Sequence, residues 1–193
     1  MARQVNPADM VTWKVLRRLF NRSRFSERAH ILHDSIVAQA RTPALFRCYA
    51  IPDTLDGRFE CLVLHVLLVM RRLRSSGVDG GNAAQELFDL VFADLDRALR
   101  ETGVGDLKVG SRVRRMAQAY FGRARALDGA LAAAAPDTLE KVLERNVYGT
   151  VSVEAETIGR LASYVRRQVA HLDSIENDRV ITGHIDFARL EGE

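Results

Sequence analysis

An almost continuous apolar run lies in the middle of the chain. The ten residues from Cys61 to Met70 are apolar apart from His65, and a helix that is apolar on all sides has to be covered on most of them. The pattern therefore predicts a helix over residues 58–74 at the centre of the hydrophobic core. The run is too short to cross a bilayer, which takes about 20 apolar residues, and arginines follow it at positions 71, 72 and 74.

Two amphipathic helices are predicted after this run. Over residues 79–102 the apolar positions recur at helical spacing and the outer face is acidic, whereas over residues 111–128 the same period is combined with arginines on the other faces. Gly103 is placed to end the first helix and Ser111 to cap the second, so residues 102–110 are predicted to be a loop. An acidic helix followed by a basic one predicts an antiparallel pair.

Shorter helices are predicted on both sides of this centre. One spans residues 26–40 with Ser26 as its N-cap, one begins at residues 136–137 and ends before Gly149, and one is capped by Ser152 and continues to about residue 172. Residues 42–57 are predicted to be a loop. Residues 173–193 have no clear period, which leaves an extended tail and a frayed end both open. The fold expected is all-α, a compact single-domain bundle of about six to seven helices.

The N-terminal region is set apart by its charge. Residues 1–24 are predicted to form a basic amphipathic arm, residues 25–173 a helical domain and residues 174–193 a C-terminal tail. In the arm, three apolar side chains oppose three cationic ones across a short helix: Trp13, Leu16 and Phe20 against Lys14, Arg17 and Arg18. Such a helix suits contact with a membrane surface, but docking of its apolar face on the core is equally open.

Composition narrows the class of protein. A chain of 193 residues can bury a single core, and 47% hydrophobic residues with four prolines favour a helical globule over disorder or a β-sandwich. Cys48 and Cys61 are too few for a disulfide framework and lack the spacing of a zinc site, which implies a reducing compartment. The arginine-rich, acid-poor start is typical of a mitochondrial transit peptide as well. With no signal-peptide core or membrane-spanning run, we expect a bacterial cytoplasmic protein in preference to this alternative. Peripheral attachment to the cytoplasmic face of the inner membrane is a further option.

The side chains that could carry chemistry lack the partners that each chemistry needs. His30 and His33 lie one turn apart, but no third metal ligand follows at helical spacing. His65 fits a hydrogen-bonded core histidine better than a ligand or a base. Asp89 and Asp96 are seven residues apart on one helix, yet the Glu-x-x-His motifs of a di-iron bundle do not occur. We therefore expect no enzyme, no metal and no cofactor.

Five short stretches stand out by their order and spacing. They are DGRFE at 56–60, LH at 64–65, F-x-D-x-D at 92–96, LRETGVGDLKVG at 99–110 and MAQAYFGR at 116–123. Together they resemble the ubiquinol-cytochrome c chaperone family, over roughly residues 25–170. The resemblance implies an assembly factor that binds newly synthesised cytochrome b and promotes its assembly into the cytochrome bc1 complex. It implies no small-molecule substrate, and leaves a membrane surface and a small partner subunit open as further partners.

The corner between the acidic and the basic helix contains more charged residues than a turn requires. Because buried charges are costly unless paired, we expect these side chains to be exposed, beside a groove with uncovered apolar surface. The residues predicted to bind the client are Arg97, Arg100, Glu101, Val104, Gly105, Asp106, Leu107 and Arg112. A nucleic-acid-binding helical regulator that uses the arginine clusters is the alternative function. A small-ligand or quinone carrier would need a deep apolar pocket instead.

Overall fold

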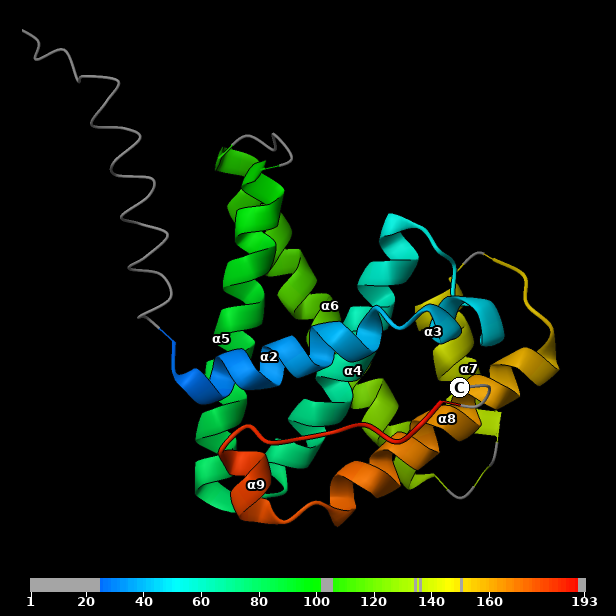
Figure 1. Cartoon of the computed structure of the whole chain (residues 1–193). Helices are drawn as coiled ribbons and strands as arrows, with labels where there is room; N and C mark the ends of the chain where they lie inside the picture. The colour runs from blue at the N-terminus through cyan, green and yellow to red at the C-terminus, as the bar shows by residue number, and fades with distance from the viewer. Residues whose placement is uncertain (1–24, 102–105, 134, 136, 150, 191–193) are drawn as a thin grey trace, which may run out of the picture.

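The helix predicted at the centre of the core is α4 (Leu55–Arg74), around which the other helices pack (Figure 1). The computed structural model describes residues 25–101, 106–133, 135, 137–149 and 151–190, and the regular elements in these ranges are all helical. Besides α4 they are α2 (Glu27–Ala40), α3 (Pro43–Cys48), α5 (Gly77–Glu101), α6 (Asp106–Ala132), α7 (Asp137–Leu143), the π-helical turn η1 (Glu144–Tyr148), α8 (Ala155–Ser174) and α9 (Asn177–Ile181). The all-α prediction is confirmed.

Burial is concentrated in α4. Every residue from Leu64 to Met70 is buried, and α4 contacts α2, α5, α6, α8, α9 and η1. The helix starts three residues earlier than the pattern predicts, because the side chain of Thr54 caps it by accepting a hydrogen bond from Gly57 N at 3.1 Å. The prediction that this helix lies at the centre of the hydrophobic core is confirmed.

Helices α5 and α6 run antiparallel beside α4, as the charge pattern predicts (Figure 1). Two predicted boundaries are wrong. Helix α5 already begins at Gly77, and α6 begins at Asp106, so that Ser111 lies inside the helix and not at its N-cap position. Val109 in this first turn is fully buried.

Two further predictions fail in the connections. Residues 42–57 are not all loop, because Pro43 occupies the first turn of α3, where its missing N–H costs nothing, and Leu45 of α3 is fully buried. Ser152 is not the cap of α8, whose N-cap is Glu154 without a side-chain hydrogen bond. The N-cap predicted at Ser26 is confirmed by a 3.3 Å hydrogen bond from Ala29 N to Ser26 Oγ.

Residues 182–190 form an extended tail rather than a frayed end, but residues 177–181, for which no helix was predicted, form α9. After α9 the chain crosses α4 and α8 (Figure 1). The buried side chain of Gln168 on α8 donates to Ala188 O at 2.8 Å and accepts from Ala188 N at 2.9 Å. Gln168 thus pairs with the tail as a neighbouring strand would, and Leu190 is buried beyond it.

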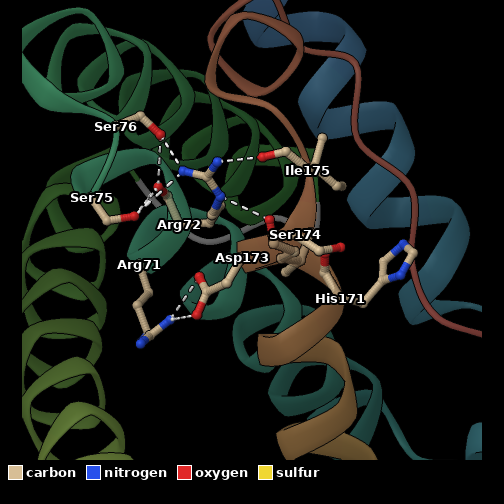
Figure 2. A network of polar contacts seen from close by, with 9 residues as sticks. Arg71, Arg72, Ser75, Ser76, His171, Asp173, Ser174 and Ile175 are labelled. Carbon is tan, nitrogen blue, oxygen red and sulfur yellow. Dashed lines mark hydrogen bonds and ion pairs between the residues drawn. The ribbon is translucent and has the colours of Figure 1, made fainter.

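Arg72 joins the end of α4 to the end of α8 (Figure 2). Arg72 is only 5% exposed, and its guanidinium donates to Leu172 O at 2.8 Å, Ile175 O at 2.5 Å and Asn177 Oδ1 at 2.9 Å. No carboxylate among the described residues pairs with it. The carbonyl groups at the C-terminal end of α8 carry partial negative charge and take that place.

Candidate functional site

An apolar groove lies between α4, α5 and α6. It is bounded by the N-terminal part of α4, the C-terminal half of α5 and the N-terminal and central part of α6, and toward the top of Figure 1 α4 stands apart from the α5–α6 pair. The groove has a volume of about 350 Å³ and is open along one side. Its lining residues are Phe59, Leu62, Val63, Val66, Val91, Phe92, Leu95, Arg112, Arg115, Met116, Ala119, Tyr120 and Arg123.

Aromatic rings shape the α5 and α6 walls. Phe88 and Phe92 have ring centroids 4.3 Å apart, and both contact Tyr120. Tyr120 and Phe121 both fall on the apolar stripe of the sequence pattern of α6, which predicts that both belong to the core. Tyr120 is buried as predicted, but the prediction is wrong for Phe121. Phe121 is 56% exposed and stacks on Phe88 from outside.

Arginines supply the charge at the groove. Arg123 is held by Glu60 of α4, with Nε 2.9 Å from Oε2, and both side chains are largely buried. Burial raises the pKa of Glu60, which the neighbouring guanidinium opposes. Arg112 and Arg115 of α6 are exposed and have no carboxylate partner in the described part of the chain.

The residues predicted to bind a client lie around this groove only in part. Arg112 lines it. Arg97 and Arg100 are exposed on α5, where they pair with Asp94 and with Asp96, the latter at 2.6 Å. Glu101 is exposed at the end of α5. Asp106 and Leu107 belong to the first turn of α6, and Val104 and Gly105 lie outside the described residues, as do the six residues predicted to touch a membrane.

Pattern analysis missed Phe59, Leu62, Val63, Arg115 and Arg123. The sequence shows only that α4 carries apolar residues on every face, and which of them line a groove depends on tertiary packing. Phe59, Leu62 and Val63 fall on the side that α5 and α6 leave uncovered.

A second polar cluster is buried behind the groove, around His65. His65 Nδ1 donates to Cys61 O at 2.8 Å, and its Nε2 accepts from Tyr164 OH at 2.7 Å. Gln39 Nε2 in turn donates to Tyr164 OH at 3.0 Å. The prediction of a hydrogen-bonded core histidine is confirmed. Cys61 lies near the ring, but burial raises its pKa to about 12, so it is a thiol and not a nucleophilic thiolate.

The described residues offer neither a metal site nor a membrane span. His33 lies near two carboxylates, Asp34 at 3.5 Å and Asp94 at 3.4 Å, but within the described ranges no three His, Cys, Asp or Glu side chains could together hold a metal ion. None of the helices in those ranges is long and apolar enough to cross a membrane.

The ion pair between Glu60 and Arg123 joins two of the five stretches that carry the resemblance. Glu60 belongs to DGRFE and Arg123 to MAQAYFGR, and the two residues are 63 positions apart in sequence. The family described as Ubiquinol-cytochrome C chaperone matches residues 47–187. The chain belongs to the ubiquinol-cytochrome c chaperone family. The resemblance inferred from the five stretches is therefore confirmed.

Relatives and a solved structure agree with this assignment. The chain is 23% identical over 146 residues to ubiquinol-cytochrome-c reductase complex assembly factor 1 of Xenopus laevis, covering 75% of this chain and 72% of the relative. It is 22% identical over 187 residues to the protein of the same name from Drosophila melanogaster, covering 90% and 72%. The crystal structure of the Cbp3 homolog from Brucella abortus superimposes with a TM-score of 0.77 at 30% identity, covering 91% of this chaperone-family chain and 97% of the other.

Proposed function

We propose that this chain binds newly synthesised cytochrome b and promotes its assembly into the cytochrome bc1 complex. Membership in the ubiquinol-cytochrome c chaperone family supports a role in assembly of that complex. The observation that carries the choice of client is the half-open apolar groove with arginines at its rim. A membrane protein made of apolar helices needs such a surface to cover it until it is inserted, and a helix face is what a groove of this kind accepts.

Co-purification tests the proposal. A tagged chain expressed in its native cell should bring newly made cytochrome b with it. Ala119 is exposed and lines the groove, so Ala119→Trp should fill the groove and reduce the amount of captured cytochrome b several-fold. Gln118 is exposed next to it but is not a lining residue, so Gln118→Trp is the matched control and should capture normally. Absence of cytochrome b from the wild-type preparation would rule out the proposed function.

The basic arm adds a proposed location. We infer from the opposition of Trp13, Leu16 and Phe20 to Lys14, Arg17 and Arg18 that residues 1–24 assist attachment to the cytoplasmic face of the membrane in which the client is inserted. Flotation with anionic vesicles tests this. Full-length protein should float, and a chain lacking residues 1–22 should stay at the bottom. Equal flotation of the two would show that the arm is not the anchor.

A further inference from the structure

The charge around the apolar groove is unevenly distributed. At one end Arg123 is neutralised by Glu60, with Nε 2.9 Å from Oε2. At the other end Arg112 and Arg115 lie one turn apart on α6, both exposed and without a carboxylate partner in the described residues. The carboxylates of α5 closest in sequence to the groove, Asp94 and Asp96, are engaged by Arg97 and Arg100. The groove therefore has one neutral end and one positive end.

The shape of the groove favours a helix over a small ligand. Small-molecule sites bury about 70–90% of their ligand, whereas this groove is open along one side. Three helices form its walls, and a fourth helix can pack into such a depression by ridges-into-grooves contact. A helix would bury one apolar face on residues such as Leu62, Val63 and Met116 and leave the opposite face outside.

We propose that the groove selects an apolar helix that carries acidic side chains at one end, and that Arg112 and Arg115 bind those carboxylates and so fix the direction in which the helix docks. This rests on the proposed function, since the helix is assigned to the client. An arginine pair one turn apart matches acidic residues one turn apart on the docked helix, and arginine–carboxylate bonds are charge-assisted and directional. A helix with basic ends would be repelled at the same place.

Two synthetic helical peptides of about 18 residues test the selectivity directly. They share one apolar face and differ only in two residues near one end, Glu in the first peptide and Lys in the second. We expect the Glu peptide to bind the full chain at least about tenfold more tightly by fluorescence anisotropy. Equal affinity for the two peptides, or no binding of either, would overturn the proposal.

Charge reversal locates the effect. In the double variant Arg112→Glu and Arg115→Glu the preference should disappear or reverse. The double variant Arg114→Glu and Arg125→Glu changes charge equally on the same helix at exposed positions that do not line the groove, and it should keep the preference. A preference that both double variants retain would refute the assignment to Arg112 and Arg115. If the first variant does not fold, the comparison of the two peptides on the wild type still decides.

Two further measurements distinguish docking of an acidic helix from binding of an anionic lipid and from the proposed function as a whole. An anionic lipid is the other occupant that arginines above an apolar groove would fit, so displacement of the Glu peptide by dodecyl phosphate at a similar concentration would assign the groove to lipid and overturn the inference. Capture of cytochrome b from cells is measured with the same variants. Full capture by Arg112→Glu/Arg115→Glu would leave the proposed function standing and remove the inference, whereas no capture by the wild type would remove the proposed function itself.

Discussion

His65 is buried completely, and this determines its charge. Burial lowers its pKa from the ordinary value of 6.5 to about 4, because an imidazolium in an apolar interior loses its hydration. The groups that face it are the Cys61 thiol and carbonyl of α4, Tyr164 of α8 and Phe187 of the tail. None of them carries a negative charge at neutral pH that could compensate a protonated ring.

Acid should therefore destabilise the fold through His65. In the unfolded chain the ring takes up a proton near pH 6.5, and in the folded chain only near pH 4, so between these values the unfolded state binds more protons. The stabilisation is complete above pH 6.5 and is lost as the pH falls toward 4. We expect the free energy of unfolding, measured by urea titration, to decrease over this range.

The variant His65→Gln separates this effect from other titrations. It keeps a polar side chain but no titrating group, so its unfolding free energy should be lower at pH 7 and should depend less on pH between 6.5 and 5. Glu60, whose pKa is raised by burial, and Glu86, whose pKa is lowered by the hydrogen bond from Arg28, titrate in both proteins and therefore cancel in the comparison. An unchanged pH dependence in His65→Gln would show that the ring is not the group responsible.

Two adjacent arginines should differ sharply in their contribution to stability (Figure 2). Arg72→Leu removes the donors that satisfy the carbonyls of Leu172 and Ile175, and unsatisfied buried acceptors cost about 1–3 kcal/mol each. We expect a loss of about 3 kcal/mol or more in chemical denaturation. Arg71 makes an exposed pair with Asp173 at 3.1 Å, so Arg71→Leu is the matched control and should cost less than about 1 kcal/mol. Similar losses would contradict the role assigned to Arg72.

The sequence could predict His65 but not Arg72. A single polar residue inside an apolar run has to be hydrogen-bonded, so the place of His65 follows from its neighbours. Arg72 belongs to an RRLR stretch that is typical of a solvated helix end. Its burial depends on the end of α8, 100 residues further along the chain. No local sequence pattern predicts this contact between α4 and α8.

At the scale of elements, the start of α5 is fixed by a close approach to the end of α4. A Cβ atom on Gly80 would lie 2.1 Å from Leu73 O and 2.6 Å from Ser76 Cβ, whereas a Cβ on Gly81 would meet nothing within 4 Å. Gly80→Ala should therefore push the two helices apart and cost about 1–3 kcal/mol. Gly81→Ala should stabilise the protein by about 0.4–1 kcal/mol, because alanine restricts the unfolded chain.

Thermal melting of these two variants measures the contrast directly. They differ only in which of two neighbouring glycines is replaced, so helix propensity affects both alike. If both melt above the wild type, α4 and α5 do not approach as closely as these distances indicate.

The C-terminal tail should be released by a single substitution in α8. Gln168→Leu leaves the backbone N–H and C=O of Ala188 without their partner, and they can regain hydrogen bonds only by leaving the helices for water. Limited trypsin digestion should then cut faster after Arg189. The control is His171→Ala on the same helix, which removes the exposed pair with Asp186 at 2.9 Å and should leave cleavage unchanged. Equal cleavage of Gln168→Leu and the wild type would mean that apolar contacts alone hold the tail.

Helix boundaries show where local signals are insufficient. Ser111 after Gly110 is a good N-cap signal, yet α6 starts five residues earlier, at Asp106. Glycine or serine inside a helix costs only about 1 kcal/mol or less, and burial of Val109 outweighs this. Periodicity predicted the existence and pairing of α5 and α6, whereas tertiary contacts set their ends.

The groove is a property of the whole molecule. Its walls come from three helices, and its neutral end depends on Glu60 and Arg123, which are 63 residues apart in sequence. The sequence alone predicted that charged and apolar residues of the α5–α6 corner would lie beside a groove, and Arg112 does line it. It could not predict the contribution of Phe59, Leu62 and Val63, since their exposure depends on how far α4 diverges from its neighbours.

Charge pairing across the molecule bears on the alternative function, nucleic-acid binding. Many arginines are already paired with carboxylates: Arg28 with Glu86, Arg58 with Asp53, Arg71 with Asp173, Arg97 with Asp94, Arg100 with Asp96, Arg123 with Glu60 and Arg166 with Glu140. Tyr120 is buried, and Phe121 stacks on Phe88. Although Arg112, Arg114, Arg115 and Arg125 on α6 have no carboxylate partner among the described residues, those residues present no row of exposed aromatic rings on which bases could stack.

We expect only weak binding of nucleic acid, with a dissociation constant above about 10 µM at 0.15 M salt. Fluorescence anisotropy with labelled duplex DNA and single-stranded RNA between 50 and 200 mM salt measures both the affinity and its salt dependence. A protein that neutralises several phosphates loses about 1000-fold or more in affinity over this range, whereas the affinity of a helix docked by apolar contacts changes little.

The measurement is repeated with a chain lacking residues 1–22, because the arm holds Lys14, Arg17 and Arg18. Binding that is tight, steeply salt-dependent and retained without the arm would make the helical domain a nucleic-acid-binding module and would contradict the assignment of its arginines to carboxylate partners.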